Sequence, residues 1–350
     1  MTNALRSRLA PALVLLAAAL ASLPPRLALA QDQPTIQKDS IVVKLRSFDS
    51  TSRNGVRRSG TPPSWLPRIK FRVNGPIASG SQLYVQFSLP TDKNWIRFDC
   101  TTNEREKGKW LETECGNEVS EDKNTSVVGL VPFSIKLRNE LQGSDLTLFT
   151  GKLKVIKVQP NPKYPADWEF FADEDWRIPI GFVFAATNEG FGSDPFLHVG
   201  FWYRGNPPDI EAHLFYNGKD IAKYTLGGND ASEWRPNMYQ WGYANCQFPG
   251  IYPGEMPADM AYDPKFEMPK NPGDYEVKVL IVNHLARSIK FTVNADGSFD
   301  NGIATANHLG AGRVIVPVQV IGNQTTTWDR TAWKTGAFYG NPLTGFTAVP

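Results

Sequence analysis

Apolar and polar residues alternate along almost every apolar segment after residue 40. Ile69, Phe71 and Val73 are separated by the charged residues Lys70 and Arg72. A period of two places successive side chains on opposite faces of a β-sheet. The same alternation occurs at 83–89, 96–100, 133–137, 146–158, 197–203, 212–216, 275–281, 289–293 and 314–320. These segments are short, rich in β-branched and aromatic residues and bounded by Gly, Pro, Asn and Asp, so the pattern predicts an all-β protein.

Three prolines between Gln159 and Pro165 interrupt the alternating pattern. Proline removes a backbone donor and stiffens an extended path, which is typical of a linker. The sequence therefore predicts a β-sandwich at 38–159, a proline-rich linker at 160–167, a second sandwich at 168–322 and a C-terminal tail at 323–350. The proline-bearing stretch 53–67 is interpreted as a long loop, because a central strand does not tolerate proline.

The second predicted sandwich carries two further signals. Asn217-Gly218 separates two alternating segments and favours the positive φ angles of a tight hairpin. A Gly-Asp-Tyr sequence ending at Tyr275 opens a strand that returns at 287–293. The chain here resembles immunoglobulin-like and fibronectin type III-like domains, in which such a Tyr bonds back to an upstream carbonyl. The resemblance implies two Ig-like antiparallel sandwiches in tandem and no catalytic residue; Val277 replaces the second Cys of antibody domains.

The first thirty residues have the order of a secretory signal. Two arginines precede an Ala- and Leu-rich stretch at 9–23, which ends at a proline pair and is followed by Ala28-Leu29-Ala30. This order predicts cleavage after Ala30, and the apolar run falls short of the roughly 20 residues of a spanning helix. We therefore expect a secreted or periplasmic protein whose mature chain does not insert into a membrane.

The charge of the mature chain excludes one class of partner. Cleavage would remove three of the 37 basic residues and none of the 35 acidic residues, which leaves a net charge of about −1. A chain without excess positive charge does not favour nucleic acid.

The three cysteines are consistent with an oxidising compartment. Cys100 and Cys115 bracket a charged loop, and we expect them to form a disulfide, which would stabilise the fold by roughly 3 kcal/mol. Cys246 is then left over. It is expected to be buried and inert, or else to pair with another chain.

No local catalytic motif is present in the sequence. It contains no G-x-S-x-G, H-E-x-x-H, G-x-x-x-x-G-K or C-x-x-C pattern. No catalytic residue, cofactor or metal site is therefore predicted, although glycosidase carboxylates leave no such motif.

Three polar groups are candidate metal or cation sites. His198 and His213 fall on successive predicted strands and could lie close together, but a third ligand is not evident. The loop 294–302, with Asp296 and Asp300, could suit Ca²⁺ but reads more simply as a turn. The acidic cluster 173–175 is interpreted as a solvated loop.

The stretch 232–272 is an aromatic insert, with eight aromatic and four Met residues. Long loops in compact domains are often functional. We expect Trp234, Tyr239, Trp241 and Tyr243 to present rings to a glycan or a protein, although the insert could instead pack as a cluster over one sheet.

Taken with the missing motifs, this pattern predicts an exported, non-catalytic structural or interaction protein of the cell envelope or extracellular space. Two alternatives stay open: a carbohydrate-binding module that uses the aromatic insert, and a hydrolase with dispersed carboxylates. The sequence does not specify the biological process, the partner or the oligomeric state.

Overall fold

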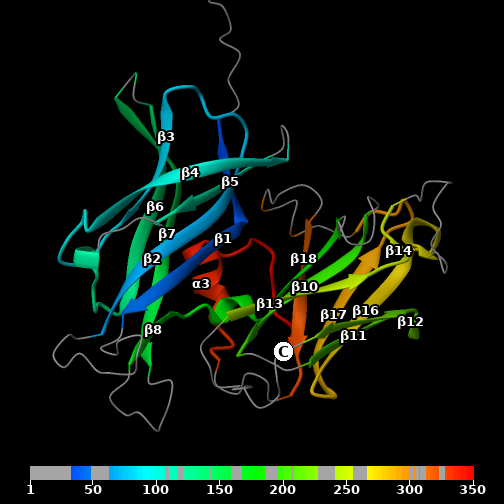
Figure 1. Ribbon diagram of the computed structural model, residues 1–350. Coiled ribbons are helices and arrows are strands. Elements are labelled where there is room, and N and C mark those ends of the chain that lie inside the picture. The colour runs from blue at the N-terminus through cyan, green and yellow to red at the C-terminus, as the bar shows by residue number, and fades with distance from the viewer. Residues whose placement is uncertain are drawn as a thin grey trace, which may run out of the picture.

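The computed structural model describes residues 33–48, 63–106, 110–116, 121–139, 141, 143–158, 168–186, 195–205, 209–227, 241–254, 266–299, 303, 307, 313–322 and 328–350. Two large antiparallel sheets of eight strands each dominate these residues, and Figure 1 shows them side by side. The prediction of an all-β fold is confirmed. The predicted signal peptide and the proline-rich linker lie outside the described residues.

The first sheet, here called the first sandwich, has the strand order β1-β2-β5-β4-β3-β6-β7-β8. Its strands are β1 (Thr35–Phe48), β2 (Ser64–Asn74), β3 (Ser81–Phe87), β4 (Ile96–Glu106), β5 (Trp110–Cys115), β6 (Gly129–Asn139), β7 (Ser144–Val158) and β8 (Glu169–Ala172), with a 3-10 helix η1 (Glu121–Lys123). The edge strands β1 and β8 contact each other. The sheet therefore folds over a single core rather than lying open.

The second sheet, the second sandwich, has the order β12-β11-β16-β17-β18-β9-β10-β13. Its strands are β9 (Ile180–Ala186), β10 (Phe196–Arg204), β11 (Asp209–Tyr216), β12 (Lys219–Gly227), β13 (Trp241–Phe248), β16 (Gly273–Ile281), β17 (His284–Val293) and β18 (Arg313–Val320). Its edge strands β12 and β13 also contact each other. The shorter elements are β14 (Ile251–Tyr252), β15 (Phe266–Glu267), and the 3-10 helices η2 (Asp175–Arg177) and η4 (Met268–Lys270).

Both sandwiches have the same cyclic strand order. If β1 to β5 are matched with β9 to β13, and β6 to β8 with β16 to β18, every neighbour in the first ring has its counterpart in the second. The two rings differ only in where the ladder is interrupted: between β8 and β1 in the first, and between β12 and β13 in the second. The pair β14 and β15 is an insertion between two matched strands.

Side chains at matched positions agree in character. Ile69 and Phe71 of β2 occupy the places of Val199 and Phe201 of β10, and all four are buried. Matching the strand ends of β3 and β11 places Phe133 at the position of Tyr275. The two sandwiches are therefore the same architecture used twice.

The tyrosine implied by the Ig-like resemblance makes the expected bond. The Tyr275 hydroxyl donates to the carbonyl of Asn271, four residues upstream, at 2.6 Å. Its ring stacks on Phe291. Phe133 has no hydroxyl, and its ring instead packs edge-on against Tyr339 from the C-terminal segment.

The local signals give a mixed outcome. Asn217 and Gly218 have φ angles of 47° and 79° and form the tight turn between β11 and β12, as predicted. The predicted loop 53–67, in contrast, ends too late, because β2 begins at Ser64 and contains Pro67. Pro67 itself pairs only with Leu45 of β1, since the ladder with β5 begins at Ile69 and Trp65 makes a separate bridge to Thr125. A position without a ladder partner on one side tolerates proline.

The first sandwich extends beyond the residues 38–159 predicted for it. β8 follows the proline-rich stretch, yet it pairs with β7 and buries Phe170 in the first core. The predicted tail at 323–350 also returns to this core. Its helix α3 (Trp333–Gly340) lies between the two sandwiches in Figure 1 and contacts β7, β1 and η2.

Cys100 and Cys115 form a disulfide in the structure. They face each other across the β4–β5 ladder, where the first sheet passes from one layer to the other. Cys246 is free and fully buried, and burial raises the pKa of its thiol to about 12. Its place in β13 matches that of Cys115 in β5, and both follow a Trp by five residues.

We expect Tyr224→Cys to form a second disulfide with Cys246. Counting along the registers, Tyr224 of β12 matches Cys100 of β4. Burial, and after it the nearby Cys246 thiol, raise the pKa of the Tyr224 hydroxyl. Oxidised variant protein should show no free thiol after denaturation, whereas the parent shows one. Ala222→Cys, two residues earlier on β12, is the matched control; a free Cys246 in folded Tyr224→Cys would show that the two positions do not match.

Candidate functional site

A buried arginine connects the two sandwiches. Arg177 of η2 is 2% exposed, and its Nε and Nη2 donate to the two carboxylate oxygens of Glu174 at 2.8 and 3.2 Å. Its Nη2 also donates to the carbonyl of Ile41 in β1 at 3.0 Å. The guanidinium lies 4.2 Å from the ring centroid of Trp202, in the second sandwich. Burial lowers the pKa of Arg177, but the charge of Glu174 and the hydrogen bonds to Glu174 and Tyr339 outweigh this effect, and the net pKa is raised.

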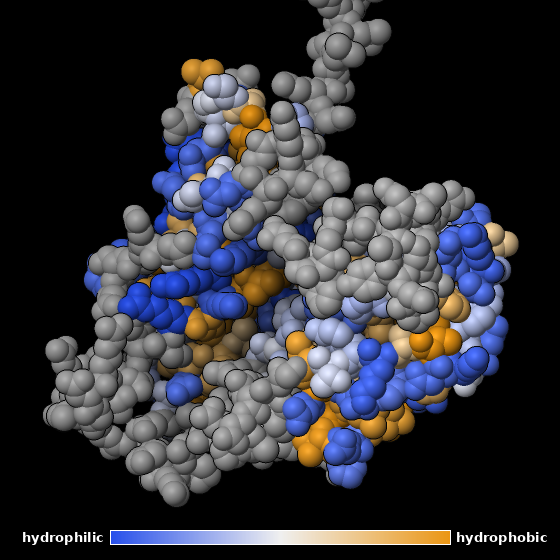
Figure 2. All heavy atoms as spheres, turned by 45° about the vertical axis from the view of Figure 1, so that its right-hand side comes forward, coloured by the Kyte–Doolittle hydropathy of each residue, from blue (hydrophilic) through white to orange (hydrophobic). Residues whose placement is uncertain are grey.

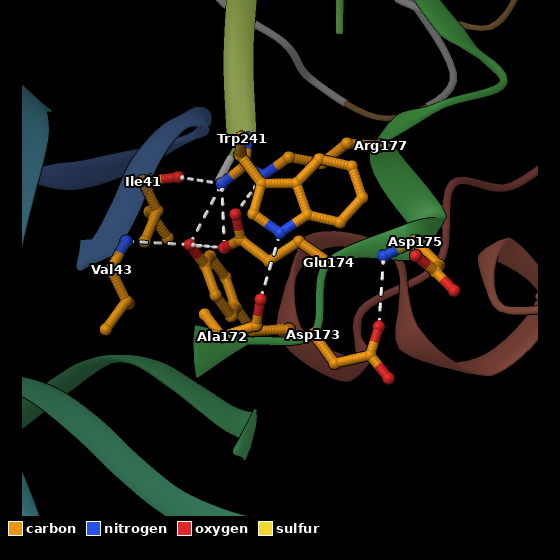
Figure 3. A network of polar contacts seen from close by, with 9 residues as sticks. Ile41, Val43, Ala172, Asp173, Glu174, Asp175, Arg177 and Trp241 are labelled. Carbon is orange, nitrogen blue, oxygen red and sulfur yellow. Dashed lines mark hydrogen bonds and ion pairs between the residues drawn. The ribbon is translucent and has the colours of Figure 1, made fainter. Parts of the chain in front are cut away.

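The hydroxyl of Tyr339 closes this network. It accepts from Arg177 Nη2 at 2.9 Å and from the Val43 backbone N–H at 2.8 Å, and it donates to Glu174 Oε1 at 2.6 Å. Figure 3 shows Ile41 and Val43 of β1 beside the side chains of Glu174 and Arg177. Burial and the nearby carboxylate raise the pKa of Tyr339, so the hydroxyl keeps its proton. The buried hydroxyl of Tyr339 therefore donates one hydrogen bond and accepts two, and its hydrogen-bonding capacity is fully used.

The acidic cluster 173–175 is not the solvated loop that its sequence suggested. Glu174 and Asp175 are buried, and Asp175 pairs with Arg204 at the end of β10. Its second carboxylate oxygen accepts from the backbone N–H of Asp329 at 2.7 Å. Burial is the main reason that the pKa of Asp175 is raised. The cluster therefore holds the second sandwich and the C-terminal segment to η2.

Phe338 and Tyr339 adopt a backbone conformation that bulky residues rarely take. Their φ angles are 47° and 60°, and both side chains are 2% exposed. Such a conformation costs about 1–3 kcal/mol per residue and persists only where surrounding contacts enforce it. Here the ring of Phe338 packs on Trp176, and the hydroxyl of Tyr339 is held at three points. The junction is therefore a tightly determined structure.

Apolar contacts complete the junction. Phe182 and Phe184 of β9 point away from the second core and join the buried cluster of the first sandwich. Trp202 and Tyr243 of the second sandwich pack against the same cluster, 5.1 Å apart between ring centroids. Strand β9 is therefore buried on both faces, which explains its nearly continuous apolar sequence.

A cleft of about 750 Å³ opens beside this junction. Its floor is the outer face of β3, β6 and β7, where Gln86, Ser134 and Thr150 form one row across the strands. Its far wall is the C-terminal segment 329–341 with Asp173 and Trp176. Figure 2 shows that, on the face it presents, hydrophobic residues form separate patches among hydrophilic ones.

Charges in the cleft are largely paired with one another. Lys154 Nζ lies 2.7 Å from Asp173 Oδ2, and this hydrogen bond is the main reason that the pKa of Lys154 is raised. Asn341 Nδ2 donates to the carbonyl of Thr150 at 3.0 Å and so ties the wall to the floor. Lys152 is exposed at the rim. Such a site offers hydroxyl, amide and ion-pair contacts suited to holding a polar ligand or partner.

The predicted binding residues fall in different places. Trp234 and Tyr239 lie outside the described residues. Trp241 is half-buried, and its Nε1–H donates to the carbonyl of Ala172 in β8 at 2.9 Å (Figure 3). Tyr243 is half-buried against Trp202 and Phe182. The structure thus places the two described rings at the junction, turned toward the first sandwich.

The histidine pair does not come together. His198 on β10 stacks between Phe184 and Phe196, whereas His213 on β11 lies between Glu211 and Asp220. The chain crosses from one layer to the other between β10 and β11, so the two strands are not neighbours. Within the described part of the chain, no group of three His, Cys, Asp or Glu side chains is arranged to hold a metal ion.

The possible Ca²⁺ loop forms a turn where it is described. Asp296 Oδ1 accepts from the backbone N–H and the hydroxyl of Ser298. These bonds lower the pKa of Asp296. Asp300 lies outside the described residues.

We expect His213 to make stability depend on pH. Hydrogen bonds to Glu211 and Asp220, both at 2.6 Å, raise the pKa of His213. Because the pKa of His213 is higher in the folded state, protonated His213 stabilises the fold fully at pH values below its unfolded pKa of about 6.5. This stabilisation is lost as pH rises through the higher pKa of the folded state. The melting temperature of His213→Gln should lack the loss that the parent shows as pH rises above about 6.5. The control is Asp274→Asn, because the Asp274 carboxylate binds Thr292 and not His213. This variant should keep the pH dependence of the parent. A pH profile of His213→Gln identical to that of the parent would contradict the role of His213.

Sequence reasoning missed the residues that define the junction. Arg177, Arg204 and Tyr339 were not singled out, because a single charged or aromatic residue carries no local pattern. One available signal was the mixture of acids, Arg177 and Trp176 at 173–177 next to an apolar run.

Comparisons with known proteins do not identify a family for this chain. No protein-family model matches the chain, and no curated protein matches it. A solved structure described as "Biofilm associated protein - BSP domain" aligns with 7% sequence identity and a TM-score of 0.16, over 89% of this chain and 64% of that chain. This chain thus spans less than two thirds of that one. A TM-score this low does not establish a common fold.

The described residues include no helix long and apolar enough to cross a membrane.

Proposed function

We propose that this chain is an exported, non-catalytic structural or interaction protein of the cell envelope or extracellular space. The observation that carries the proposal is the buried junction between two sandwiches of the same cyclic strand order. There Arg177 binds Glu174 and Tyr339 and lies against Trp202, and Asp175 pairs with Arg204 of the second sandwich. Flexible attachment is the default for neighbouring domains unless their interface is large and apolar. A rigid pair of sandwiches suits a role in which spacing and orientation matter.

The strand order supports an Ig-like architecture for both sandwiches. In the second, β9-β10-β13 corresponds to strands A, B and E, and β12-β11-β16-β17 corresponds to C′, C, F and G. The same letters apply to β1-β2-β5 and to β4-β3-β6-β7 in the first. β8 and β18 each add one strand after G. Domains of this type are common on cell surfaces, where they bind through exposed faces and loops.

Export is supported by the N-terminal sequence and by the disulfide. The order of basic residues, apolar run and Ala28-Leu29-Ala30 fits a cleaved signal. The Cys100–Cys115 bond requires an oxidising compartment to persist. Mass spectrometry of the exported protein should find Gln31 at its N-terminus, and recovery of intact Met1 in the membrane would contradict export.

The cleft beside the junction is the surface we assign to a protein or glycan partner. It lies on the rigid part of the molecule and combines hydroxyl and amide groups with one ion pair. Ser134→Trp would fill the floor of the cleft. The matched control is Thr292→Trp, on the outer face of the second sandwich.

The test combines binding with turnover. Immobilised mature protein is incubated with the envelope fraction and with a glycan array, and the captured ligand is then titrated against both variants. Ser134→Trp should weaken binding at least tenfold and Thr292→Trp should not. Turnover of glycoside or ester substrates that disappears on changing one Asp or Glu would overturn the non-catalytic assignment.

A further inference from the structure

Arg287 is a fully buried arginine inside the second sandwich. It lies on β17, where its cross-strand neighbours are Val279 of β16 and Val320 of β18. Its side chain is 0% exposed. At the matched position of the first sandwich stands Leu146, opposite Leu137 as Arg287 is opposite Val279. The architecture therefore does not require an arginine here.

Most donors of Arg287 are unused. Nη1 donates to the neighbouring carbonyl of Ala286 at 2.8 Å. Nε and Nη2 have no hydrogen-bond partner among the residues that the structure describes. Burial lowers the pKa of Arg287 to about 10, so the group still carries its charge at neutral pH. A buried, charged donor without a partner is strongly unfavourable, and native proteins rarely retain one.

The unused edge has the geometry that binds a carboxylate elsewhere in the same chain. Arg177 uses its own Nε and Nη2 to hold the two oxygens of Glu174. This edge of a guanidinium presents two parallel N–H groups, which match two oxygens of a carboxylate, sulfate or phosphate. On the adjoining strand β16, the carboxylate of Glu276 accepts a hydrogen bond from Ser288 Oγ at 2.6 Å.

We propose that Arg287 is the anchor of a buried oxyanion site in the second sandwich. The ligand is a small oxyanion with two coplanar oxygens, either a free carboxylate or an inorganic sulfate or phosphate. Because the guanidinium is sealed from solvent, the anion enters as the sandwich folds and then stabilises it. Binding of this kind raises the melting temperature with anion concentration.

The experiment refolds the full mature chain and its Arg287→Met variant in chloride, acetate, sulfate or phosphate at equal ionic strength. At 100-fold excess over the dissociation constant, a bound oxyanion should raise the melting temperature of the parent by roughly 5 °C relative to chloride. Arg287→Met should show no such difference, and in chloride it should be at least as stable as the parent. Lys290→Met, an exposed change on the same strand, should retain the response.

The anions distinguish the source of the ligand. A response to acetate alone indicates a carboxylate, and a response to sulfate and phosphate indicates an inorganic oxyanion. Equal responses in parent and Arg287→Met would reveal a general salt effect and overturn the proposal. If Arg287→Met does not fold, the ¹⁵N resonance of Arg287 Nε in the parent serves instead: it should shift on refolding with the anion, and an unchanged resonance would also overturn it.

Discussion

Replacing Arg177 by Met is expected to lower the free energy of unfolding by about 3–5 kcal/mol. The change leaves the buried carboxylate of Glu174 without its main partner, and removing one member of a buried ion pair has costs of this size. It also removes a donor from the Ile41 carbonyl and from the Tyr339 hydroxyl. Denaturant unfolding followed by tryptophan fluorescence measures the effect.

Two controls separate the buried charge from the loss of a side chain. Arg97→Met breaks the surface pair with Asp99, and should change stability by about 1 kcal/mol or less, because exposed ion pairs contribute little. The double change Glu174→Leu with Arg177→Met removes both charges and should recover much of the loss. A loss of under 1 kcal/mol in Arg177→Met would mean that the network does not fix the junction.

Trp241→Ala is expected to cost about 3 kcal/mol and to loosen the junction. Large losses on Trp→Ala follow from buried surface and the cavity left behind, and half-burial places this residue at the low end of the range. The change also removes the hydrogen bond that the carbonyl of Ala172 in β8 accepts from Trp241 Nε1. Hydrogen exchange should therefore accelerate at β8 in the first sandwich, although the substituted residue belongs to the second.

This outcome separates two roles for the ring. If Trp241 serves mainly as an exposed binding platform, Trp241→Ala leaves the melting temperature nearly unchanged and weakens association instead. Trp168→Ala, at a Trp that is 39% exposed, is the matched control and should change stability much less. Trp241→Phe keeps most of the apolar area and should lose only about 1 kcal/mol with the hydrogen bond.

The candidate site could be predicted only in part. Aromatic density singled out 232–272 as an insert, but Trp241–Phe248 of that stretch form strand β13 of the second sheet, and the direction of the Trp241 ring depends on where β8 lies. The repeated Trp and Cys spacing of β5 and β13 was visible in the sequence, yet two matches are too few to indicate a duplication. Only the shared strand order shows that these positions correspond.

The sequence by itself determined the all-β class, the alternating strands with their inward faces and one tight turn, but it did not predict β1, β5, β8, β9 or β13. Alternation needs only neighbouring residues, and the Asn217-Gly218 turn needs only its own backbone. Likewise, the short separation of Cys100 and Cys115 made their pairing foreseeable.

The tertiary structure alone decided how the sandwiches are joined. Arg177 meets Ile41 across 136 residues and Tyr339 across 162, and no local pattern records such contacts. Charged residues at 174, 175 and 177 read as solvated until their partners are in place, because burial of a charge is tolerable only with those partners.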